Sequence, residues 1–359
     1  MRYVRVDDAR RFTEQVFCGL GVSTQDAVRC ADILIASDLR GIESHGIGRL
    51  KMYYDRIRQG IQHAVTDIEV VRDRAAVGVW DGRHGMGQII AYRAMDKAIQ
   101  KASQYGLGAI AVRNSTHFGI CGYYAQMAID RDMIGLIVTN ARPSVAPLFG
   151  VTPLLGTNPI CFGAPSDMEY PFLFDAATSI TQRGKIEQLE REELPTPAGW
   201  AIDYQGMDCT DTSKLLRDLL TQQAAFLALG GNSESMGGHK GYGLSTMVEI
   251  LSAALQRGSF LTGLMGPESG IPKPYCLGHF FLAVNIDFFE DVPIFKKTVG
   301  DILRALKNAQ PIPGNPPIRV AGEKEFNSTR KIKREGIPVT PKLDHNLKSM
   351  AQTLGITEL

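Results

Sequence analysis

The run Leu107-Gly108-Ala109-Ile110-Ala111-Val112 is the stretch of sequence that decides the fold. It carries no charged residue, which is typical of a short strand that is buried on both faces. The residues before it, 87–104, have apolar positions at helical spacing, and residues 123–132 predict a shorter helix. Residues 134–139 form a second apolar run of strand type. Helices that alternate with buried strands predict an α/β core.

Further elements are expected around this core. They are a strand pair at 67–71 and 75–80, a helix at 183–193, an apolar helix at 244–255 and a strand at 280–286. Arg72-Asp73-Arg74 is expected to form the turn of the strand pair. Residues 195–235 are polar and irregular, so no regular element is expected there.

Both ends of the chain predict helices. Asp7 or Asp8 is expected to cap the first helix, and Ser23 the second. The last part of the chain predicts helices at 293–309, 323–335 and 341–353. We therefore expect a helical domain made of residues 1–66 and 290–359, with an α/β domain of residues 67–289 inserted in it.

Composition narrows the classes of function. The 359 residues are 44% hydrophobic and 21% charged, and the formal net charge is +1. This length suffices for two domains. A charge near zero gives no electrostatic basis for binding nucleic acid or a membrane surface. The one basic cluster, Arg330-Lys331-Ile332-Lys333-Arg334, is expected on the solvated face of a helix.

Cysteine usage and the N-terminus predict a reduced, cytoplasmic protein. The six cysteines, at positions 18, 30, 121, 161, 209 and 276, form no Cys-x-x-Cys pair. Neither a disulfide scaffold nor a metal site is expected from such spacing. The first residues lack the apolar core of a signal peptide. No apolar run reaches the length of about 18 residues that a membrane-spanning helix needs.

One stretch groups residues that suit a single reaction: Asp38-Leu39-Arg40-Gly41-Ile42-Glu43-Ser44-His45-Gly46-Ile47-Gly48-Arg49-Leu50. His45 titrates near neutral pH and can accept or donate a proton, and Ser44 can orient that proton. Arg49 carries a planar cation that fits a carboxylate. In a helix His45 and Arg49 would share one face, which suits a 2-hydroxy or 2-keto acid. The same spacing also fits an ordinary surface pair, and the two glycines weaken the prediction of a helix.

Several motifs are missing from the sequence. No Gly-x-Gly-x-x-Gly follows a strand, so the usual dinucleotide fingerprint is absent. The phosphate-binding Gly-x-x-x-x-Gly-Lys-Ser/Thr, the Gly-x-Ser-x-Gly of many serine hydrolases and the zinc-binding His-Glu-x-x-His are absent too. These absences argue against nucleotide phosphoryl transfer and against the commonest hydrolases.

Three glycine-rich or polar loops remain as candidate site-builders. Thr116-His117-Phe118-Gly119 follows a buried strand, where His117 is placed either for a pocket or for a local hydrogen bond. Gly238-His239-Lys240-Gly241 begins a helix, which suits a phosphate or simply a cap with a solvated lysine. Asp175-Ala176-Ala177-Thr178-Ser179 offers oxygens to a ribose or a substrate, or forms a strand-end turn.

Five motifs in order resemble the type-2 malate/L-lactate dehydrogenase family. They are Arg40-Gly41-Ile42-Glu43-Ser44-His45-Gly46, Asn114-Ser115-Thr116-His117-Phe118-Gly119, Pro153-Leu154-Leu155-Gly156-Thr157-Asn158-Pro159, Asp175-Ala176-Ala177-Thr178-Ser179 and Gly238-His239-Lys240-Gly241-Tyr242-Gly243. The resemblance extends from about residue 5 to residue 355. Relatives include sulfolactate and ureidoglycolate dehydrogenases, diketogulonate reductase and an imine reductase.

The resemblance implies NAD or NADP bound on a non-Rossmann, mixed-sheet α/β domain, which agrees with the missing fingerprint. It also implies a homodimer with the active site between subunits. His45, assisted by Ser44, would be the acid/base, although His117 holds that role in some relatives. Arg49 would bind the substrate carboxylate, and Thr157 would touch the substrate. The cofactor would be lined by His117, Phe118, Gly119, Asp175, Ala176, Ala177, His239, Lys240, Gly322 and Glu323.

One departure bears on the substrate. Where many relatives carry Asn-x-Ser-Pro, this chain has Asn140-Ala141-Arg142-Pro143. Arg142 either binds a second carboxylate, as malate has, or faces solvent. We expect oxidation of an L-2-hydroxy acid, with malate preferred. The alternatives are a reductase of another 2-keto acid or of a cyclic imine, and a non-catalytic nicotinamide sensor. The choice between NAD and NADP and the direction of the reaction stay open.

Overall fold

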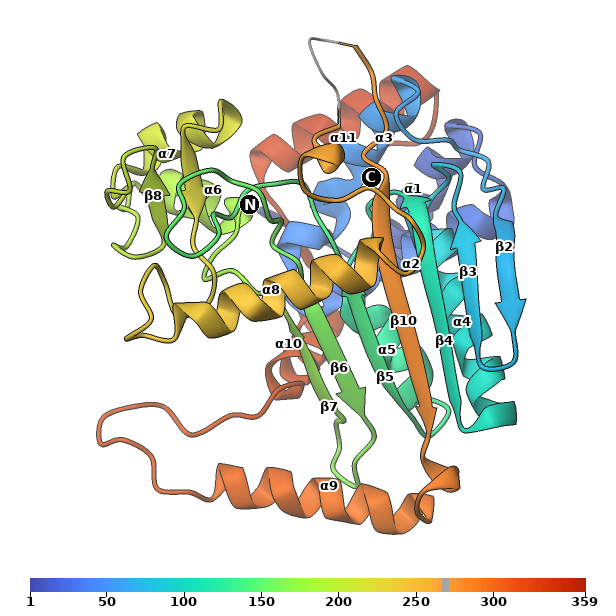
Figure 1. The fold of residues 1–359 in the computed structure, drawn as a ribbon. Coiled ribbons are helices and arrows are strands. Elements are labelled where there is room, and N and C mark those ends of the chain that lie inside the picture. Colours follow the sequence, from blue (N-terminus) through green and yellow to red (C-terminus); the bar gives the residue numbers. More distant parts are fainter. Residues whose placement is uncertain (267–270) are drawn as a thin grey trace.

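The computed structural model describes residues 1–266 and 271–359. Its centre is a seven-stranded sheet in the order β2-β3-β4-β10-β5-β6-β7 (Figure 1). The strands are β2 (Glu69–Arg74), β3 (Val77–Asp81), β4 (Leu107–Ser115), β5 (Met133–Thr139), β6 (Ile160–Ala164), β7 (Phe172–Ala176) and β10 (Leu277–Asn285). Only β3 and β4 pair in parallel among these described strands, so the sheet is mixed, as expected.

Helices cover both faces of this sheet. Helices α4 (Gly87–Tyr105) and α5 (Cys121–Ile129) lie on one face, and α8 (Gly238–Ala253) crosses the other (Figure 1). At Gly108 a Cβ would overlap the backbone of α4, and at Gly278 it would overlap the backbone of α8. Glycine therefore lets a helix approach each face closely. The decisive run at residues 107–112 is the start of β4, next to the central strand β10.

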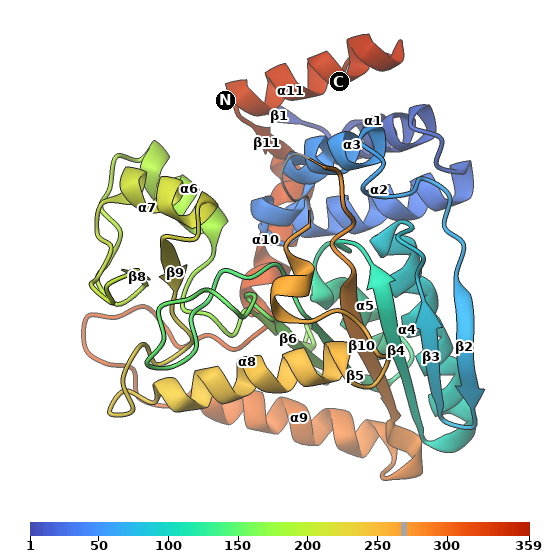
Figure 2. The same cartoon turned by 45° about the horizontal axis from the view of Figure 1, so that its top comes forward.

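The two ends of the chain pack together. Helices α1 (Val6–Gly19), α2 (Thr24–Leu39) and α3 (Leu50–Arg58) share one apolar cluster with α11 (Pro341–Leu354). Strand β1 (Arg2–Val4) pairs with β11 (Ile337–Val339), as Figure 2 shows. Met86 and Ile89, beside the start of α4, belong to the same cluster. The division into a helical and an inserted α/β domain stays a prediction.

A smaller unit lies beside the sheet. It is built from α6 (Arg183–Arg191), β8 (Ala201–Asp203), α7 (Thr212–Leu220) and β9 (Ala224–Phe226) around its own apolar cluster. The expectation of irregular structure at 195–235 is therefore wrong for part of that segment. Asp211 caps α7 by accepting from the Lys214 N–H at 2.8 Å, a signal that the sequence contains.

The remaining helices are α9 (Val292–Lys307) and α10 (Glu323–Glu335), both near their predicted positions. The basic cluster lies on the exposed side of α10, as expected. Ser23 caps α2, but Arg5 rather than an aspartate occupies the cap of α1. The turn of the first strand pair falls at Ala75 and Ala76, because β2 continues to Arg74. No described helix combines the length and apolar character needed to cross a membrane.

Candidate active site

The segment after α2 breaks into two short turns. Residues Glu43–His45 and Ile47–Arg49 are separate 3-10 turns, with extended backbone at Gly46 between them. His45 and Arg49 therefore do not share the helix that their spacing would allow, which agrees with the two glycines that weakened that prediction. The backbone at Gly46 passes directly over the side chain of Asp38, and a Cβ there would overlap its carboxyl group.

Asp38 anchors this segment from below. Its side chain is 3% exposed, and its Oδ2 accepts a hydrogen bond from the Ile47 N–H at 2.7 Å. Burial raises the pKa of Asp38 to about 8, and the charge of Glu43 adds to the rise against the opposing hydrogen bond from Ile47. In most molecules the Asp38 carboxyl is thus protonated at neutral pH. It fixes the chain between His45 and Arg49.

The anchored segment presents Ser44, His45 and Arg49 together. Ser44 Oγ lies 2.9 Å from His45 Nδ1, and Arg49 Nε donates to the Ser44 carbonyl oxygen at 2.5 Å. The terminal nitrogens of Arg49 make no hydrogen bond to the described residues, so they remain available for a carboxylate. The sequence-predicted triple of hydroxyl, imidazole and guanidinium is therefore assembled, although by a different backbone.

His117 joins this group from the loop after β4. The rings of His45 and His117 stack, with centroids 5.4 Å apart and an interplanar angle of 22°. Burial, assisted by Arg49, lowers the pKa of His45 to about 4. Burial, together with His45 and nearby arginines, holds the pKa of His117 well below its usual value. Both imidazoles are neutral at pH 7, the form in which one nitrogen can accept a proton.

The other two residues predicted to contact the substrate, besides Arg49, differ in setting. The carbonyl oxygen of Thr157 accepts from the Thr178 N–H at 3.0 Å, which ties the loop before β6 to the loop after β7. The side chain of Arg142 is exposed. Its position leaves its predicted role as a binder of a second carboxylate untested.

A second group lies around Asp175, at the end of β7. Its Oδ2 accepts from the Gly122 N–H in the first turn of α5 at 2.6 Å. Burial raises the pKa of Asp175 to about 6, partly offset by that hydrogen bond and by Arg40. Ala176 and Ala177 continue the chain as half-buried residues. Phe118 instead lies in the core, with its ring centroid 4.4 Å from that of His279.

Gly322 and Glu323 lie where α10 begins. Gly322 has φ +95°, and a Cβ there would press on the backbone of Pro171 and Leu173 beside β7. Glu323 accepts from Lys307 Nζ at 2.6 Å. The start of α10 is thereby held against the strand that carries Asp175.

His239 and Lys240 stand apart from these groups. Both are exposed at the start of α8 and line a shallow hollow of about 440 Å³ with residues between Leu229 and Leu244. None of the other predicted site residues lines that hollow. Within one chain, the structure does not bring these two residues to His45 or Asp175.

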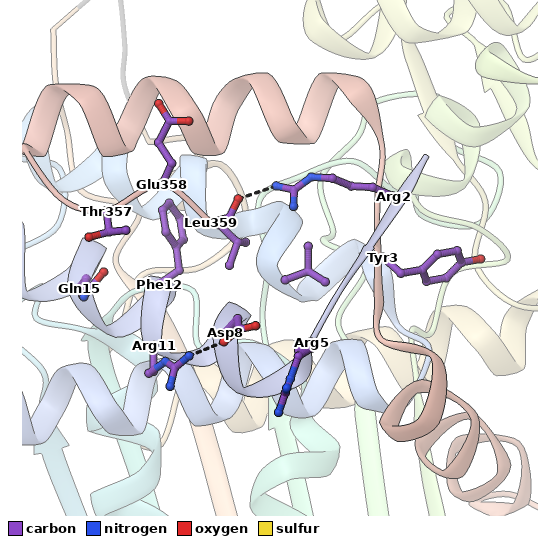
Figure 3. A pocket seen from close by; sticks show the side chains of 11 residues that line it. Arg2, Tyr3, Arg5, Asp8, Arg11, Phe12, Gln15, Thr357, Glu358 and Leu359 are labelled. Carbon is purple, nitrogen blue, oxygen red and sulfur yellow. Dashed lines mark hydrogen bonds and ion pairs between the residues drawn. The ribbon is translucent and has the colours of Figure 1, made fainter.

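A further hollow of about 490 Å³ lies between α1 and the C-terminal residues (Figure 3). Two of its cations are already paired, Arg2 with Asp344 and the Leu359 carbonyl, and Arg11 with Asp8. It contains none of the predicted site residues.

Comparison with known proteins shows which family the chain belongs to. Residues 4–348 match the model of the malate/L-lactate dehydrogenase family. The chain belongs to this family. It is 40% identical to a malate dehydrogenase of Pyrococcus abyssi, with 99% of this chain and 97% of that protein covered. It is 35% identical to an L-sulfolactate dehydrogenase of Methanocaldococcus jannaschii, covering 98% and 97%. A crystal structure of malate dehydrogenase from Entamoeba histolytica superposes with a TM-score of 0.96 at 39% identity, covering 99% of both chains.

The proteins of this family are oxidoreductases, and their reactions use a nicotinamide cofactor. The structure adds three residues that sequence reasoning missed: Asp38 beneath the Ser44–Arg49 segment, Tyr53 against His117, and Arg40 beside Asp175. Asp38 and Arg40 were visible in the sequence as polar residues close to the motif. For Tyr53 the sequence contains no such signal.

The anchor makes a prediction about stability. The pKa of Asp38 lies above its usual value in the folded protein, so its neutral form is favoured there and stability falls as the pH rises towards 8. Asp38→Asn keeps an oxygen for the Ile47 N–H but cannot ionise. Between about pH 5 and 7, the free energy of unfolding of the wild type should fall by roughly 1 kcal/mol more per pH unit than that of Asp38→Asn.

Chemical denaturation at several pH values measures this difference. The matched control is Asp55→Asn in α3, whose partly exposed carboxylate pairs with Lys51 at 2.5 Å. The control should keep the wild-type pH dependence. Parallel curves for wild type and Asp38→Asn would contradict the assignment of Asp38 as a buried, largely protonated anchor.

Proposed function

We propose that this protein transfers a hydride between a nicotinamide cofactor and C2 of a small L-2-hydroxy acid, with malate and oxaloacetate as the preferred pair. The observation that carries the proposal is the group of Ser44, His45, His117 and Arg49. The neutral imidazole rings of His45 and His117 stack on each other, and the terminal guanidinium nitrogens of Arg49 are unpaired among the described residues. A hydroxyl group and a carboxylate on adjacent carbons match this pair of functions.

His45 and Arg49 divide the work on the substrate. For His45 to act as the base, its Nδ1 carries the hydrogen and donates to Ser44 Oγ, which leaves Nε2 to accept the proton of the C2 hydroxyl as the C2–H bond breaks. Arg49 holds the C1 carboxylate in a bidentate contact and so orients C2. When bound, the nicotinamide ring supplies the acceptor of the hydride in oxidation and its donor in reduction. Because His45 is neutral at working pH, it can accept the hydroxyl proton when the hydroxy acid is oxidised. In the reverse reaction the same group returns that proton to the C2 oxygen.

The residues present fit such a cofactor. A dinucleotide needs cationic donors for its phosphates and an acceptor for ribose hydroxyls. Arg40 has a buried Nη1 without a hydrogen-bond partner among the described residues, and the carboxylate of Asp175 lies close enough to affect its pKa. A buried donor without a partner calls for an explanation, and a bound phosphate supplies one. Arg40 and Asp175 would hold the phosphate and ribose, near the start of α10.

Similarity to the malate dehydrogenase of Pyrococcus abyssi and to that of Entamoeba histolytica supports malate as the substrate. Arg142 would bind the second carboxylate of malate, because its exposed guanidinium suits a carboxylate. Sulfolactate is the second candidate, since its sulfonate would meet the same cation.

The family also suggests a homodimer, which we include in the proposal. Apolar side chains are exposed along α8 at Leu244, Met247 and Ile250, and along α9 at Ile294, Ile302 and Leu306. Exposed apolar rows of this kind are common at contacts between copies of a chain.

The proposal is tested by following absorbance of reduced nicotinamide with purified protein. Malate, lactate and sulfolactate are offered in parallel, each with NAD and with NADP, and the matching keto acids are offered with the reduced cofactors. We expect turnover with malate or oxaloacetate and the highest kcat/KM for that pair. His45→Gln, purified alongside, should lose at least about a hundredfold of kcat, because general acid–base catalysis contributes about that much. Equal rates in His45→Gln, or no turnover of any acid, would contradict the proposal.

Arg49→Lys tests the carboxylate contact. The point charge of lysine cannot reproduce a bidentate fork, so KM for the hydroxy acid should rise about tenfold or more. Steady-state kinetics at saturating cofactor measure this rise. Arg58→Lys is the control, because Arg58 donates to the Tyr54 hydroxyl at 2.7 Å. An unchanged KM in Arg49→Lys would move the carboxylate site elsewhere.

Arg40→Gln tests the phosphate contact. Losing a charged partner of a phosphate should raise the Kd of the cofactor about tenfold. Quenching of protein fluorescence by NADH and by NADPH measures both constants without turnover. An equal rise in Kd for NADH and NADPH assigns Arg40 to the pyrophosphate. A rise for NADPH alone assigns it to the 2′-phosphate. Arg131→Gln is the control, because Arg131 donates to the Met127 carbonyl oxygen at 3.1 Å and to Asp96 at 3.4 Å. Unchanged Kd values for both cofactors in Arg40→Gln would contradict a phosphate role.

A further inference from the structure

His117 receives two hydrogen-bond contacts on the same ring nitrogen. The hydroxyl of Tyr53 lies 2.5 Å from His117 Nδ1, and the Gly119 N–H donates to that Nδ1 at 3.4 Å and also contacts the Tyr53 hydroxyl oxygen. Tyr53 comes from α3, which begins directly after Arg49, whereas Gly119 comes from the loop after β4. Two separate parts of the fold therefore meet at one nitrogen.

These contacts decide where the proton of His117 sits. A backbone N–H can only donate, so Nδ1 accepts and carries no hydrogen. The Tyr53 hydroxyl must then donate to Nδ1 as well. A neutral imidazole with a bare Nδ1 has its hydrogen on Nε2. Burial keeps the ring neutral, with His45, Arg56, Arg49 and His279 facing it from the surrounding elements.

We propose that Tyr53 is a positioning residue that holds His117 as its Nε2–H tautomer, so that His117 donates a hydrogen bond to the C2 oxygen of the substrate while His45 moves the proton. This inference rests on the proposed function and assigns different tasks to the two histidines that compete for one role. A ring that carries its hydrogen on Nε2 has no basic lone pair there for a substrate proton, and its basic Nδ1 is occupied by Tyr53 and Gly119. Its neutral donor instead stabilises negative charge on the C2 oxygen.

Tyr53 is suited to this task by its packing. Its side chain is fully buried and its ring meets that of Phe17 edge-on, with centroids 6.1 Å apart. The hydroxyl therefore has little freedom to turn away from His117. Burial also raises the pKa of Tyr53, so the hydroxyl keeps the hydrogen that it donates. The neighbouring Tyr54 is nearly as buried, but its hydroxyl accepts from Arg58 instead.

Tyr53→Phe removes this one oxygen and keeps the packed ring, and Tyr54→Phe is the matched control. The first readout is nitrogen-15 NMR of histidine-labelled protein without substrate, with the His117 signals assigned by their loss in His117→Gln. In wild type and in Tyr54→Phe we expect an unprotonated Nδ1 and a protonated Nε2. In Tyr53→Phe the Nδ1–H tautomer should become populated, because the Gly119 contact that remains is 3.4 Å long and too weak to hold the ring in one tautomer alone.

The second readout is kinetic. Losing one neutral hydrogen bond should lower kcat about three- to tenfold in Tyr53→Phe, with KM for the acid and Kd for NADH near wild type. Tyr54→Phe should show wild-type kcat. Melting curves establish that both variants are folded.

The two readouts separate the inference from the proposed function. An Nδ1–H signal from His117 in the wild-type protein would overturn the inference whatever the enzyme does. A wild-type tautomer and kcat in Tyr53→Phe would overturn it too. If no hydroxy acid is turned over at all, the proposed function fails, while the NMR result still decides the tautomer.

Discussion

The structure depends on the contact between a buried carboxyl and a backbone that lies directly on it. Asp38 ends α2 with its side chain under the loop and accepts from the Ile47 N–H. Gly46 is required there because no Cβ fits above the carboxyl. This contact divides the segment into two short turns and so places His45 and Arg49. A buried carboxyl is costly to ionise, and the high pKa of Asp38 reflects that cost.

Electrostatics at the site follow from the same burial. The stacked rings of His45 and His117 lie in a low-dielectric setting beside permanent cations, and both stay neutral. Neutral imidazoles can act as an acceptor and as a donor in one reaction, because their tautomers are set by their own hydrogen bonds. The fold supplies those bonds from three different elements: Ser44 for one ring, and Tyr53 and Gly119 for the other.

Much of this could be predicted from the sequence. Apolar runs with helical or strand spacing located the main strands and most helices, because burial dictates those patterns. The grouping of Ser44, His45 and Arg49 was predicted as well, but the helix that was considered as its basis is absent from the structure. The spacing of His45 and Arg49 does not reveal that the Asp38 carboxyl lies against Gly46 and divides the segment between them. Register across the sheet was beyond reach too, since β10 enters between β4 and β5 from far along the chain.

The tautomer-setting contacts could not be read from the sequence for a related reason. Tyr53 and His117 are 64 positions apart, and a buried tyrosine in an apolar helix looks like any core residue. His239 and Lys240 show the opposite case, since a phosphate-binding pattern at a helix start is exposed and lies in its own hollow. Local patterns thus indicate which residues have useful chemistry, while the fold determines which of them meet.

The most direct test of the account is a crystal structure of the protein with NADH and oxalate, a small dicarboxylate that resembles the keto acid. We expect one carboxylate of oxalate on the terminal nitrogens of Arg49, with an oxygen of the other carboxylate between His45 and His117. Oxalate bound away from Arg49, or with neither histidine in hydrogen-bond distance of it, would contradict the central claim that the Asp38-anchored segment builds the active site.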